Sequence, residues 1–417
     1  MLDDIKPIRP RSGMPQQTNQ NTENIAVMPA PAFMTPEQVA ARDSRDELPP
    51  PQSTAHRGKA PRGPKKWIAK WKRLSRNKKI VIISALVGLL IGGGLIWWFV
   101  LRGKPMPAMP VIKEETKQAE EPPKPIVSRL TGVKVTTDQE KLPVTGIMIE
   151  NSPDARPQAG VYEAGVVYEA IAEGGITRFL TLFQETVPGY IGPVRSVRPY
   201  YLDFLAPYDA PIVHAGGSGP ALAQVKSEGF KDIDHGANAS LFQRVNNRFA
   251  PHNLYTNRQA IINLQNSKGW GTSTFTGFVR KADQPSATPN AKTVDVTISG
   301  ALYNSHYDYD AASNSYLRSE GGRPHMDEKT AKQLNPKVVV AIVTTHRYDG
   351  IYSVYGVTGK GDAYVFQDGS VTKGTWEKAN RKSQYKFSDA SGASLGLNAG
   401  QTWVTMVTGS DAIKHAP

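Results

Sequence analysis

The 417-residue chain contains no cysteine. Disulfide bonds, thiolate metal ligands, a cysteine nucleophile and a lipid-modified cysteine anchor are therefore excluded for this sequence. Tyrosine is absent from the first 161 residues, although the chain has 16 tyrosines. The first 64 residues are rich in Pro, Gln, Asn, Arg and Ser and have too few apolar residues to bury a core. We expect residues 1–64 to form a disordered tail.

Acidic residues are absent between Glu47 and Glu114, and basic residues are concentrated in the same region. Of the net charge of +13, residues 1–79 carry +9 (16 Lys and Arg against 7 Asp and Glu). Residues 102–417 carry only +4 (34 against 30), so the part expected to fold is close to neutral. The excess therefore does not indicate a nucleic-acid-binding domain, and we expect no nucleic-acid partner.

One long apolar run, residues 80–101, contains no charged residue. As a helix it would span roughly 33 Å, which matches a hydrocarbon core of about 30 Å. The basic segment 65–79 precedes it, and only Arg102 and Lys104 directly follow it. This asymmetry predicts an uncleaved single-pass transmembrane helix with the N-terminus in the cytoplasm, the basic juxtamembrane segment on an anionic inner leaflet, and the C-terminal part outside.

Gly88 and Gly92 lie four residues apart within this run. Such a pair lets two membrane helices approach closely, so a homodimer is one hypothesis. Glycine is also common in single membrane helices, and the pair alone does not decide between the two interpretations.

The remaining chain divides by composition into an α+β ectodomain on a stalk. Residues 102–127 are rich in proline and are predicted to form an extended stalk. Residues 128–282 alternate strand and helix patterns, which indicates an α/β domain. A segment rich in Pro, Ala, Ser and Asn follows, and residues 291–410 have mainly strand patterns, which indicates a β-rich domain.

Expected strands are those with alternating or continuous apolar and β-branched residues, and expected helices are those with a period near 3.6. In the first half we expect strands at 146–150, 166–171, 176–185 and 211–214, and helices at 197–205, 220–228 and 258–266. In the second half we expect strands at 293–298, 338–345, 351–357, 363–366 and 402–407.

Strands 166–171 and 176–185 are predicted to form a hairpin around Gly174 and Gly175. A turn of two or four residues places Glu169 and Arg178 on the same face, which is otherwise apolar. A charge in that setting needs a partner. The pair is interpreted either as an ion pair that fixes the register or as part of a ligand site.

A strand, a glycine loop and a helix follow one another at residues 212–220, with His214, Gly216, Gly217 and Ser218 in the loop. The start of such a helix exposes N–H groups that can bind phosphate or carboxylate. The loop lacks the lysine of a P-loop and the spacing of a dinucleotide-binding loop, and ordinary turn chemistry gives the same pattern.

Further candidates are polar residues near expected strand ends and turns, where sites on α/β scaffolds lie. Arg195 and Arg198 are three apart and would be neighbours in a helix; each can bind carboxylate or phosphate through a planar fork. The other candidates are Glu150, Asn151, Arg156, Glu173, His252 and Asn253.

Catalysis is not specified by any motif. His214 or His252 could act as a base with Ser218, and Glu150, Glu169 and Glu173 could supply an acid–base pair. Ser218 does not lie in a Gly-x-Ser-x-Gly elbow, since proline follows Gly219. His306, Asp308 and Asp310 alternate on an expected strand and are interpreted as a polar sheet face rather than a metal site. No cofactor and no metal are expected.

Five motifs, MIENSPDARPQAG, VVYEAIAEGGITRF, GPVRSVRPYY, VHAGGS and APHNLYT, resemble those of the YerB-like family of bacterial extracytoplasmic proteins over about residues 128–410. The resemblance implies an N-terminal α/β part and a β-rich C-terminal part, but no reaction and no catalytic residue. Many members resemble lipoproteins anchored through an N-terminal cysteine, which this chain lacks.

Two functions remain open from the sequence. The first is a non-catalytic module of the cell envelope that binds an anionic ligand, such as a wall peptide or wall polymer. It would use Asn151, Arg156, Arg178, Arg195, Arg198, Asn253 and the Gly216 loop. The second is an envelope hydrolase or transferase that uses the Glu and His candidates as acid and base.

Overall fold

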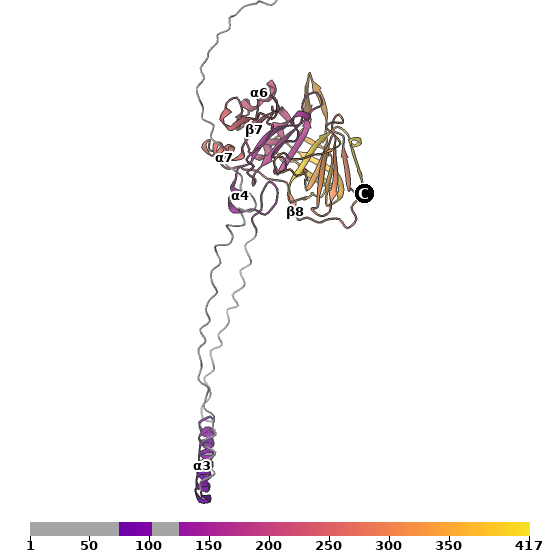
Figure 1. Cartoon of the computed structure of the whole chain (residues 1–417). Coiled ribbons are helices and arrows are strands. Elements are labelled where there is room, and N and C mark those ends of the chain that lie inside the picture. The colour runs from indigo at the N-terminus through magenta and orange to yellow at the C-terminus, as the bar shows by residue number, and fades with distance from the viewer. Residues whose placement is uncertain (1–74, 102–124) are drawn as a thin grey trace, which may run out of the picture. The chain divides into compact units, whose positions relative to one another are not determined.

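The computed structural model describes residues 75–101 and 125–417, which belong to two separate units (Figure 1). The first contains α3 (Arg76–Leu101), whose stretch Arg76–Trp98 has a mean hydropathy of 2.5 and no buried part. The predicted apolar helix is confirmed, and its length and composition suffice to cross a membrane. The predictions for residues 1–64, for most of 65–79 and for the stalk as far as residue 124 lie outside the described residues.

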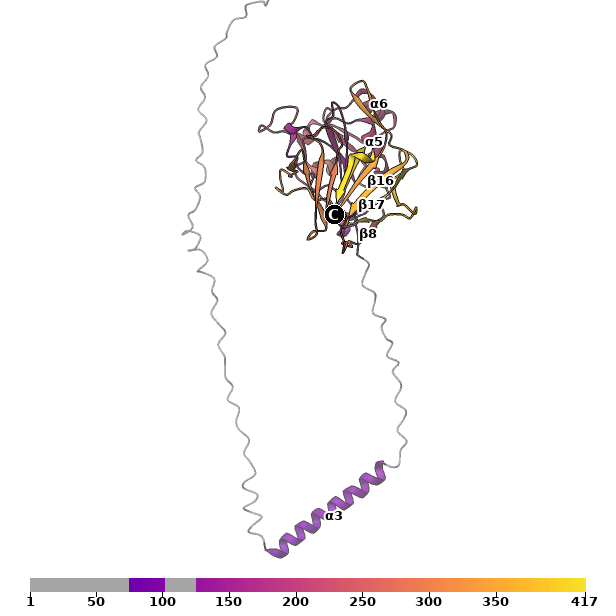
Figure 2. The same ribbon diagram turned by 90° about the vertical axis from the view of Figure 1, so that its right-hand side faces the viewer.

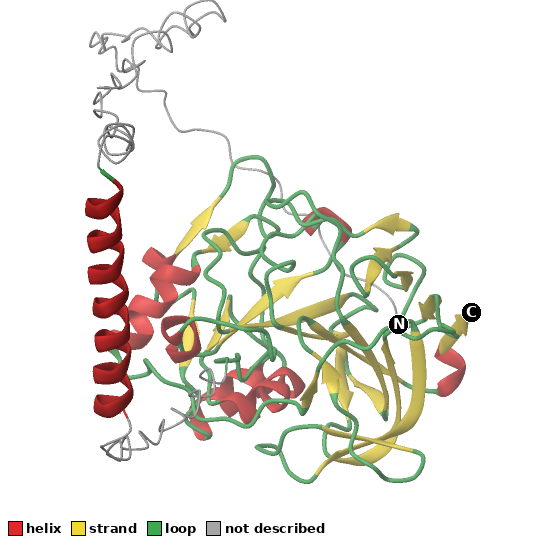
Figure 3. Cartoon of the chain, turned by 90° about the horizontal axis from the view of Figure 1, so that it is seen from below, coloured by secondary structure: helices red, strands yellow, loops and turns green. Residues whose placement is uncertain are grey.

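The second unit is a mixed α+β structure whose α-helices all lie in its first half. They are α4 (Thr137–Lys141), α5 (Pro199–Leu205), α6 (Gly219–Ser227) and α7 (Arg258–Ser267). From residue 268 to the C-terminus the described chain has strands and one short 3-10 helix, Ser410–Ala412. The predicted α+β class with a β-rich second half is confirmed. Figure 3 distinguishes the helices from the strands by colour.

The strands of the first half are short and mostly buried. They are β1 (Thr145–Glu150), β2 (Val166–Ile171), β3 (Thr177–Phe183), β4 (Ile212–His214), β5 (Asp232–Asp234), β6 (Phe242–Arg244) and β7 (Leu254–Thr256). Those of the second half are β8 (Arg280–Lys281), β9 (Thr293–Val296), β10 (Ser305–Asp310), β11 (Ser315–Glu320), β12 (Arg323–Pro324), β13 (Val338–Val343), β14 (His346–Asp349), β15 (Tyr352–Tyr355), β16 (Gly359–Gln367), β17 (Ser370–Lys378), β18 (Lys386–Asp389), β19 (Leu397–Asn398), β20 (Thr402–Val407) and β21 (Ile413–Ala416).

One ten-stranded sheet runs through both halves, in the order β18-β17-β16-β13-β20-β2-β3-β1-β4-β5. The halves join where β20 pairs in parallel with β2, with Tyr168 opposite Val404. A second sheet, β12-β11-β10-β9-β21, comes entirely from the second half. Figure 2 turns the unit so that β16 and β17 of the large sheet face the viewer.

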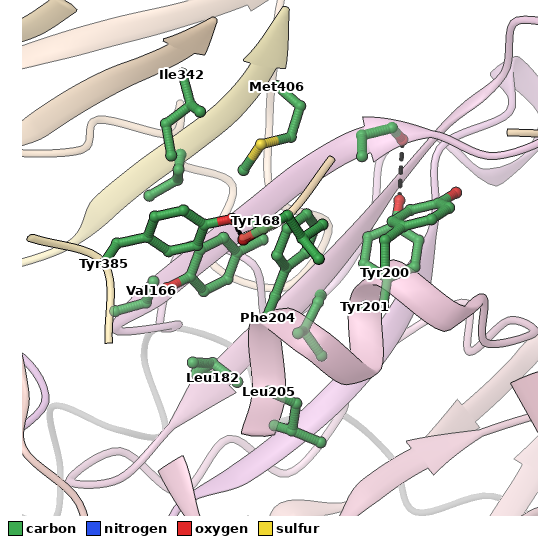
Figure 4. Packing of buried hydrophobic residues seen from close by; sticks show 14 of the residues in the cluster. Val166, Tyr168, Leu182, Tyr200, Tyr201, Phe204, Leu205, Ile342, Tyr385 and Met406 are labelled. Carbon is green, nitrogen blue, oxygen red and sulfur yellow. Dashed lines mark hydrogen bonds between the residues drawn. The ribbon is translucent and has the colours of Figure 1, made fainter. Parts of the chain in front are cut away.

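The hydrophobic core lies on both faces of the large sheet, because β1, β2 and β3 are buried along their whole length. Met148 and Leu180 share a cluster with residues of α5 and α6, whereas Ile147 and Phe179 pack with Ile261 of α7. Helices therefore cover opposite faces of the sheet. The first cluster also takes residues from both halves of the chain, as Figure 4 shows for Tyr168, Phe204, Tyr385, Ile342 and Met406.

The hairpin of β2 and β3 is present, but the predicted pairing of Glu169 with Arg178 is wrong. The turn has three residues, since the N–H of Ala172 donates to the carbonyl of Ile176 at 2.7 Å. Glu169 therefore lies opposite Phe179, and Arg178 lies opposite Ala170. A shift of one residue turns a side chain to the other face of the sheet. Both faces are buried here, so the hydrophobic pattern gave no check on the register.

The true partner of Glu169 is Arg318 of β11, which comes from the second sheet. One Nη atom of Arg318 lies 3.2 and 3.1 Å from the two carboxylate oxygens, and both side chains are fully buried. Glu169 also accepts hydrogen bonds from the indole of Trp403 at 2.9 Å and from the hydroxyl of Thr177 at 3.2 Å. This buried ion pair joins the two sheets and the two halves of the chain.

Replacing Glu169 with alanine should lower the free energy of unfolding by about 3–5 kcal/mol, because the buried Arg318 keeps only Glu320 as a carboxylate partner and Trp403 and Thr177 lose their acceptor. Urea unfolding of the full chain in detergent, followed by tryptophan fluorescence, measures the change. Glu140→Ala is the matched control, since Glu140 pairs at 2.8 Å with the exposed Arg129. It should cost less than about 1 kcal/mol. Equal losses in the two variants would contradict a central role for the pair.

Candidate functional site

The end of β1 and the segment after it carry three of the sequence candidates, Glu150, Asn151 and Arg156. β1 is a fully buried strand that ends at Glu150, and the chain then turns through the short 3-10 helix Pro153–Ala155. Proline at the start of this helix and serine before it favour the turn. Glu150 and Asn151 are thereby held rigidly at the carboxyl end of β1, which is a common position for binding groups in α/β sheets.

Glu150 and His252 are brought together by the fold. His252 Nδ1 donates to Glu150 Oε1 at 3.0 Å, and the hydroxyl of Ser152 donates to the same oxygen at 3.0 Å. Arg195 Nε lies 3.5 Å from that oxygen, and Glu150 Oε2 is buried with no hydrogen-bond partner among the described residues. Ser152 and Glu150 both lie on the Nδ1 side of the imidazole. A serine nucleophile activated by a histidine–carboxylate pair needs them on opposite nitrogens.

Asn151 connects this segment with the second half of the chain. Its amide nitrogen donates to Glu320 of β11 at 2.6 Å, and its oxygen accepts from Arg156 Nε at 3.1 Å. Arg156 also donates to the carbonyls of Asn151 and Leu302, at 3.0 and 2.8 Å, and lies over the ring of Tyr303. Both side chains thus fix the position of segment 151–157 against the second sheet.

Below them lies a buried polar network centred on Arg318. Burial acts to lower the pKa of Arg318, but the carboxylates of Glu169 and Glu320 outweigh it and raise that pKa. Burial raises the pKa of Glu320 although Arg318 and Arg156 oppose it. Burial, followed by the charges of Arg318 and Arg156, holds the pKa of His325 well below its usual value. His325 is therefore neutral, with Nδ1 accepting from Arg318 and Nε2 donating to Gln158 at 2.8 Å.

A cleft of about 470 Å³ opens above this network, and we call it the Arg156 cleft. Its walls come from both halves of the chain: Pro153, Arg156 and Pro157 on one side, and Leu302, Glu320, Gly321, Arg323, Pro324, His325 and Met326 on the other. Arg323 is exposed, and its side chain has no ion pair or hydrogen bond among the described residues. The cleft therefore combines apolar walls, two arginines and a buried carboxylate.

Arg178, Arg198 and Glu173 form a separate cluster. Arg178 lies 3.2 Å from Glu173, and Arg198 forms an ion pair with the same carboxylate. Burial, and then the charge of Arg178, lower the pKa of Arg198. Arg195 and Arg198 were expected to be neighbours in a helix, and this is wrong. Both precede α5 in an extended segment, where the N–H of Arg195 donates to the carbonyl of Met148. Neither Arg178 nor Arg198 lines the Arg156 cleft.

The glycine loop at 215–218 is already in contact with carboxylates of this chain. His214 is fully buried and lies 2.9 Å from Asp232 and 3.4 Å from Asp234. The N–H of Gly216 donates to Asp234 at 2.8 Å, and Ser218 caps α6. Gly217 packs against Val197 and Leu222, which would contact any side chain added there. Two carboxylates beside the loop disfavour an external anion.

The other candidates have local partners. Asn253 accepts a hydrogen bond from Arg244 at 2.7 Å and donates one to the carbonyl of Val245. Its side chain therefore stabilises the loop in which it lies. His306 of β10 lies between Asp295 and Asp308 on an exposed strand face. The Glu and His candidates thus do not gather in one place: Glu150 and His252 meet, whereas Glu169, Glu173 and His214 lie in three other environments.

Arg318, Glu320, Arg323 and His325 were missed by sequence reasoning. The available signal was the alternation in β11, where Tyr316, Arg318 and Glu320 share one buried face. Two opposite charges on a buried face require partners, which would have marked this strand as part of a polar network.

Comparison with known proteins places the chain in a family. Two family models match it: the N-terminal domain of "Protein of unknown function (DUF3048)" at residues 130–271, and the C-terminal domain at residues 294–404. The chain belongs to the DUF3048 family. Both walls of the Arg156 cleft fall within these DUF3048 segments, with Pro153–Pro157 in the first and Leu302–Met326 in the second.

A DUF3048 relative from Bacillus subtilis (strain 168), named "Putative lipoprotein YerB", is 32% identical over 300 residues. The alignment covers 69% of this chain and 88% of the relative. The crystal structure of the YerB protein from Bacillus subtilis matches with a TM-score of 0.64 and 28% identity, over 70% of this chain and all of that one. The fold of the globular part is thus shared with an experimentally determined DUF3048 structure.

The neutral state of His325 predicts a pH dependence of stability. The unfolded histidine binds a proton below about pH 6.5, whereas the folded one does not until much lower pH. The stability from this group is therefore complete above pH 6.5 and is lost as the pH falls. Between pH 7 and pH 5 the wild type should lose up to about 2 kcal/mol more than His325→Gln. Urea unfolding at several pH values measures this. Glu320 titrates in both proteins, so its contribution cancels when the two free energies of unfolding are subtracted. Equal slopes of the free energy of unfolding against pH in the two proteins would contradict a neutral His325.

Proposed function

We propose that the globular part is a binding module of the bacterial cell envelope that takes an anionic peptide ligand in the Arg156 cleft. The observation that carries this proposal is the presence of two arginines and a buried carboxylate in one cleft with apolar walls. Binding sites for small ligands have this composition, with a few placed polar groups in a largely apolar hollow.

The charges of the cleft favour a ligand with a carboxylate. Arg323 has no partner among the described residues, and Arg156 uses three of the five N–H groups of its guanidinium within the chain. Both can donate charge-assisted hydrogen bonds to an anion. His325 is neutral and adds no charge.

Glu320 makes a peptide a better ligand than a polymer of phosphates. Its Oε2 is buried and has no hydrogen-bond partner among the described residues, although Arg156 Nε lies 3.4 Å away. A buried acceptor gains from a donor. A peptide offers an N–H group to Glu320 and a carboxylate to the arginines, whereas poly(glycerol phosphate) carries a phosphate charge on every unit, which the carboxylate of Glu320 repels. Wall peptides, with several carboxylates and amides, fit this requirement.

We place the site of action outside the membrane on the basis of α3, its flanking charges and the relatives. α3 supports an anchor that crosses the membrane once, and the basic residues before the apolar run support an N-terminus in the cytoplasm and a globular part outside. The name of the Bacillus subtilis relative describes a lipoprotein, which is also anchored at a membrane. Because this chain has no cysteine, we propose that α3 takes the place of a lipid anchor.

The lack of cysteine makes this topology simple to test. Lys141 is exposed in α4, and Ser44 lies before the apolar helix. In intact cells a membrane-impermeant maleimide should label Lys141→Cys, and it should label Ser44→Cys only after lysis. Labelling of Ser44→Cys in intact cells would overturn the proposed orientation, and the unchanged protein gives the background.

Arg323→Gln should weaken binding of muramyl dipeptide, which carries a carboxylate and peptide N–H groups, by about ten-fold or more. The reason is the loss of a charge-assisted hydrogen bond worth about 1.5–3 kcal/mol. Isothermal titration calorimetry of the full chain in lipid nanodiscs measures the dissociation constant.

Arg347→Gln is the matched control, because Arg347 is exposed on β14 and does not line the cleft. It should bind as the wild type does. Poly(glycerol phosphate) serves as the second ligand and should bind more weakly than the peptide. Equal effects of the two substitutions would argue against the Arg156 cleft, and stronger binding of the polymer would argue against a peptide.

A second candidate function is hydrolysis or group transfer, and the contact between Glu150 and His252 favours it. The carboxylate holds Nδ1. Nε2 of the partly buried imidazole lies 3.9 Å from Asp154 Oδ2 and has no hydrogen bond among the described residues, so it can act as a general base. Mass spectrometry of the peptide after incubation separates the two functions. A product that disappears in Glu150→Gln would support catalysis, whereas unchanged peptide supports binding alone.

A further inference from the structure

A second hollow lies in the β-rich half, where the chain passes from β13 into the hairpin of β14 and β15 and on into β16. It has a volume of about 600 Å³. We call it the threonine groove, after Thr344, Thr345, Thr358 and Thr408, which line it together with Lys360 and Asp362. None of its residues takes part in the Arg156 cleft.

Two glycines keep this groove open. A Cβ atom on Gly356 would lie 2.5 Å from the hydroxyl oxygen of Thr345, and one on Gly361 would lie 2.8 Å from the indole nitrogen of Trp376. Both distances are shorter than real side-chain contacts. Trp376 is itself fixed, since its indole N–H donates to the carbonyl of Val343 at 2.9 Å. The wall of the groove is therefore closely packed at these two positions.

The polar groups on the groove are largely free. Thr345, Thr358 and Thr408 are exposed, and no side-chain hydrogen bond of theirs occurs among the described residues. Lys360 and Asp362 are likewise exposed and form no ion pair within the part of the chain that the structure describes. His346 Nε2 is buried and lacks a partner there. Donors and acceptors are thus both present, and the two charges cancel.

An exposed aromatic ring, that of Tyr348, lies next to His346, which lines the groove. His346 of β14 lies between Tyr348 and Tyr355, with ring centroids 4.9 and 4.6 Å away. Tyr355 is buried, whereas the side chain of Tyr348 is 55% exposed. An exposed tyrosine offers an apolar face and a polar hydroxyl to a ligand.

We infer that the threonine groove binds an uncharged oligosaccharide. Sugar hydroxyls both donate and accept hydrogen bonds, as threonine hydroxyls do, and the C–H face of a sugar ring packs on an aromatic ring. An apolar ligand would leave the hydroxyls of the groove without partners, which is costly. An anion would meet Asp362 as well as Lys360. This inference does not depend on the Arg156 cleft and concerns a different ligand class.

Saturation-transfer difference NMR with tetra-N-acetylchitotetraose, which carries no charge, tests the inference on the full chain in nanodiscs. The wild type should transfer saturation to the ring and acetyl protons of the sugar. The double variant Thr345→Val with Thr358→Val should reduce this transfer at least five-fold, because valine keeps the shape and removes the hydroxyl. Tyr348→Ala should reduce it as well.

Two controls locate the effect. Thr276→Val changes an exposed threonine outside the groove, and Arg323→Gln changes the other cleft; both should keep the wild-type signal. Circular dichroism confirms that each variant is folded. No transfer to the sugar with the wild type, or equal transfer with the double variant, would overturn the inference. Loss of signal in Arg323→Gln would also overturn it, by placing the sugar in the Arg156 cleft.

Discussion

The ion pair between Glu169 and Arg318 is the interaction on which the arrangement of the globular part depends. Two charges with no exposed surface are stable only because each is surrounded by partners: Trp403 and Thr177 for the carboxylate, Ser305 and Glu320 for the guanidinium. Such a pair adds little net stability over apolar packing, but a displaced partner would be very costly. It therefore constrains β2 of one sheet and β11 of the other to a single relative position.

The positions of the walls of the Arg156 cleft depend on the same ion pair. Glu320 lies two residues after Arg318 on the same strand face, and it holds Asn151 at 2.6 Å. The segment after β1 is thus connected to the second sheet through a short series of buried hydrogen bonds. The cleft walls come from both DUF3048 segments, and neither segment contains the cleft by itself. A rigid base of this kind is what a binding site needs to hold its arginines in place.

Much of the fold was accessible from the sequence because local patterns determine local elements. The apolar run of α3, the hairpin of β2 and β3, the helices α6 and α7 and the strands β13 and β20 all follow from periodicity and turn residues. The partner of Glu169 was not accessible, because it lies 149 residues away and the strands around it are buried on both faces. The three-residue turn then placed Arg178 on the opposite face from the one expected.

The candidate site shows the same limit. Asn151 and Arg156 were identified from their place after a strand. The structure puts Arg156 in the wall of the cleft and the buried Asn151 behind it, in contact with Glu320. Arg323 lies in β12 and His325 directly follows it, and both line the cleft opposite Arg156. No local pattern records this long-range arrangement. The glycine loop had the composition of an anion site, but Asp232 and Asp234 of β5 are its neighbours. Strand order, rather than loop composition, decided its environment.

The pairing of β2 with β20 also has a consequence for how the chain is made. Glu169 and Trp403 are neighbours in the structure but 234 residues apart in the chain. During synthesis β2 leaves the ribosome long before β20. The edge of β2 that pairs with β20 therefore stays unpaired until β20 has been made. Contacts of such high sequence separation slow folding, and an open strand edge attracts other strands. A nascent chain of this kind would therefore benefit from a chaperone that covers β2 until translation is nearly complete.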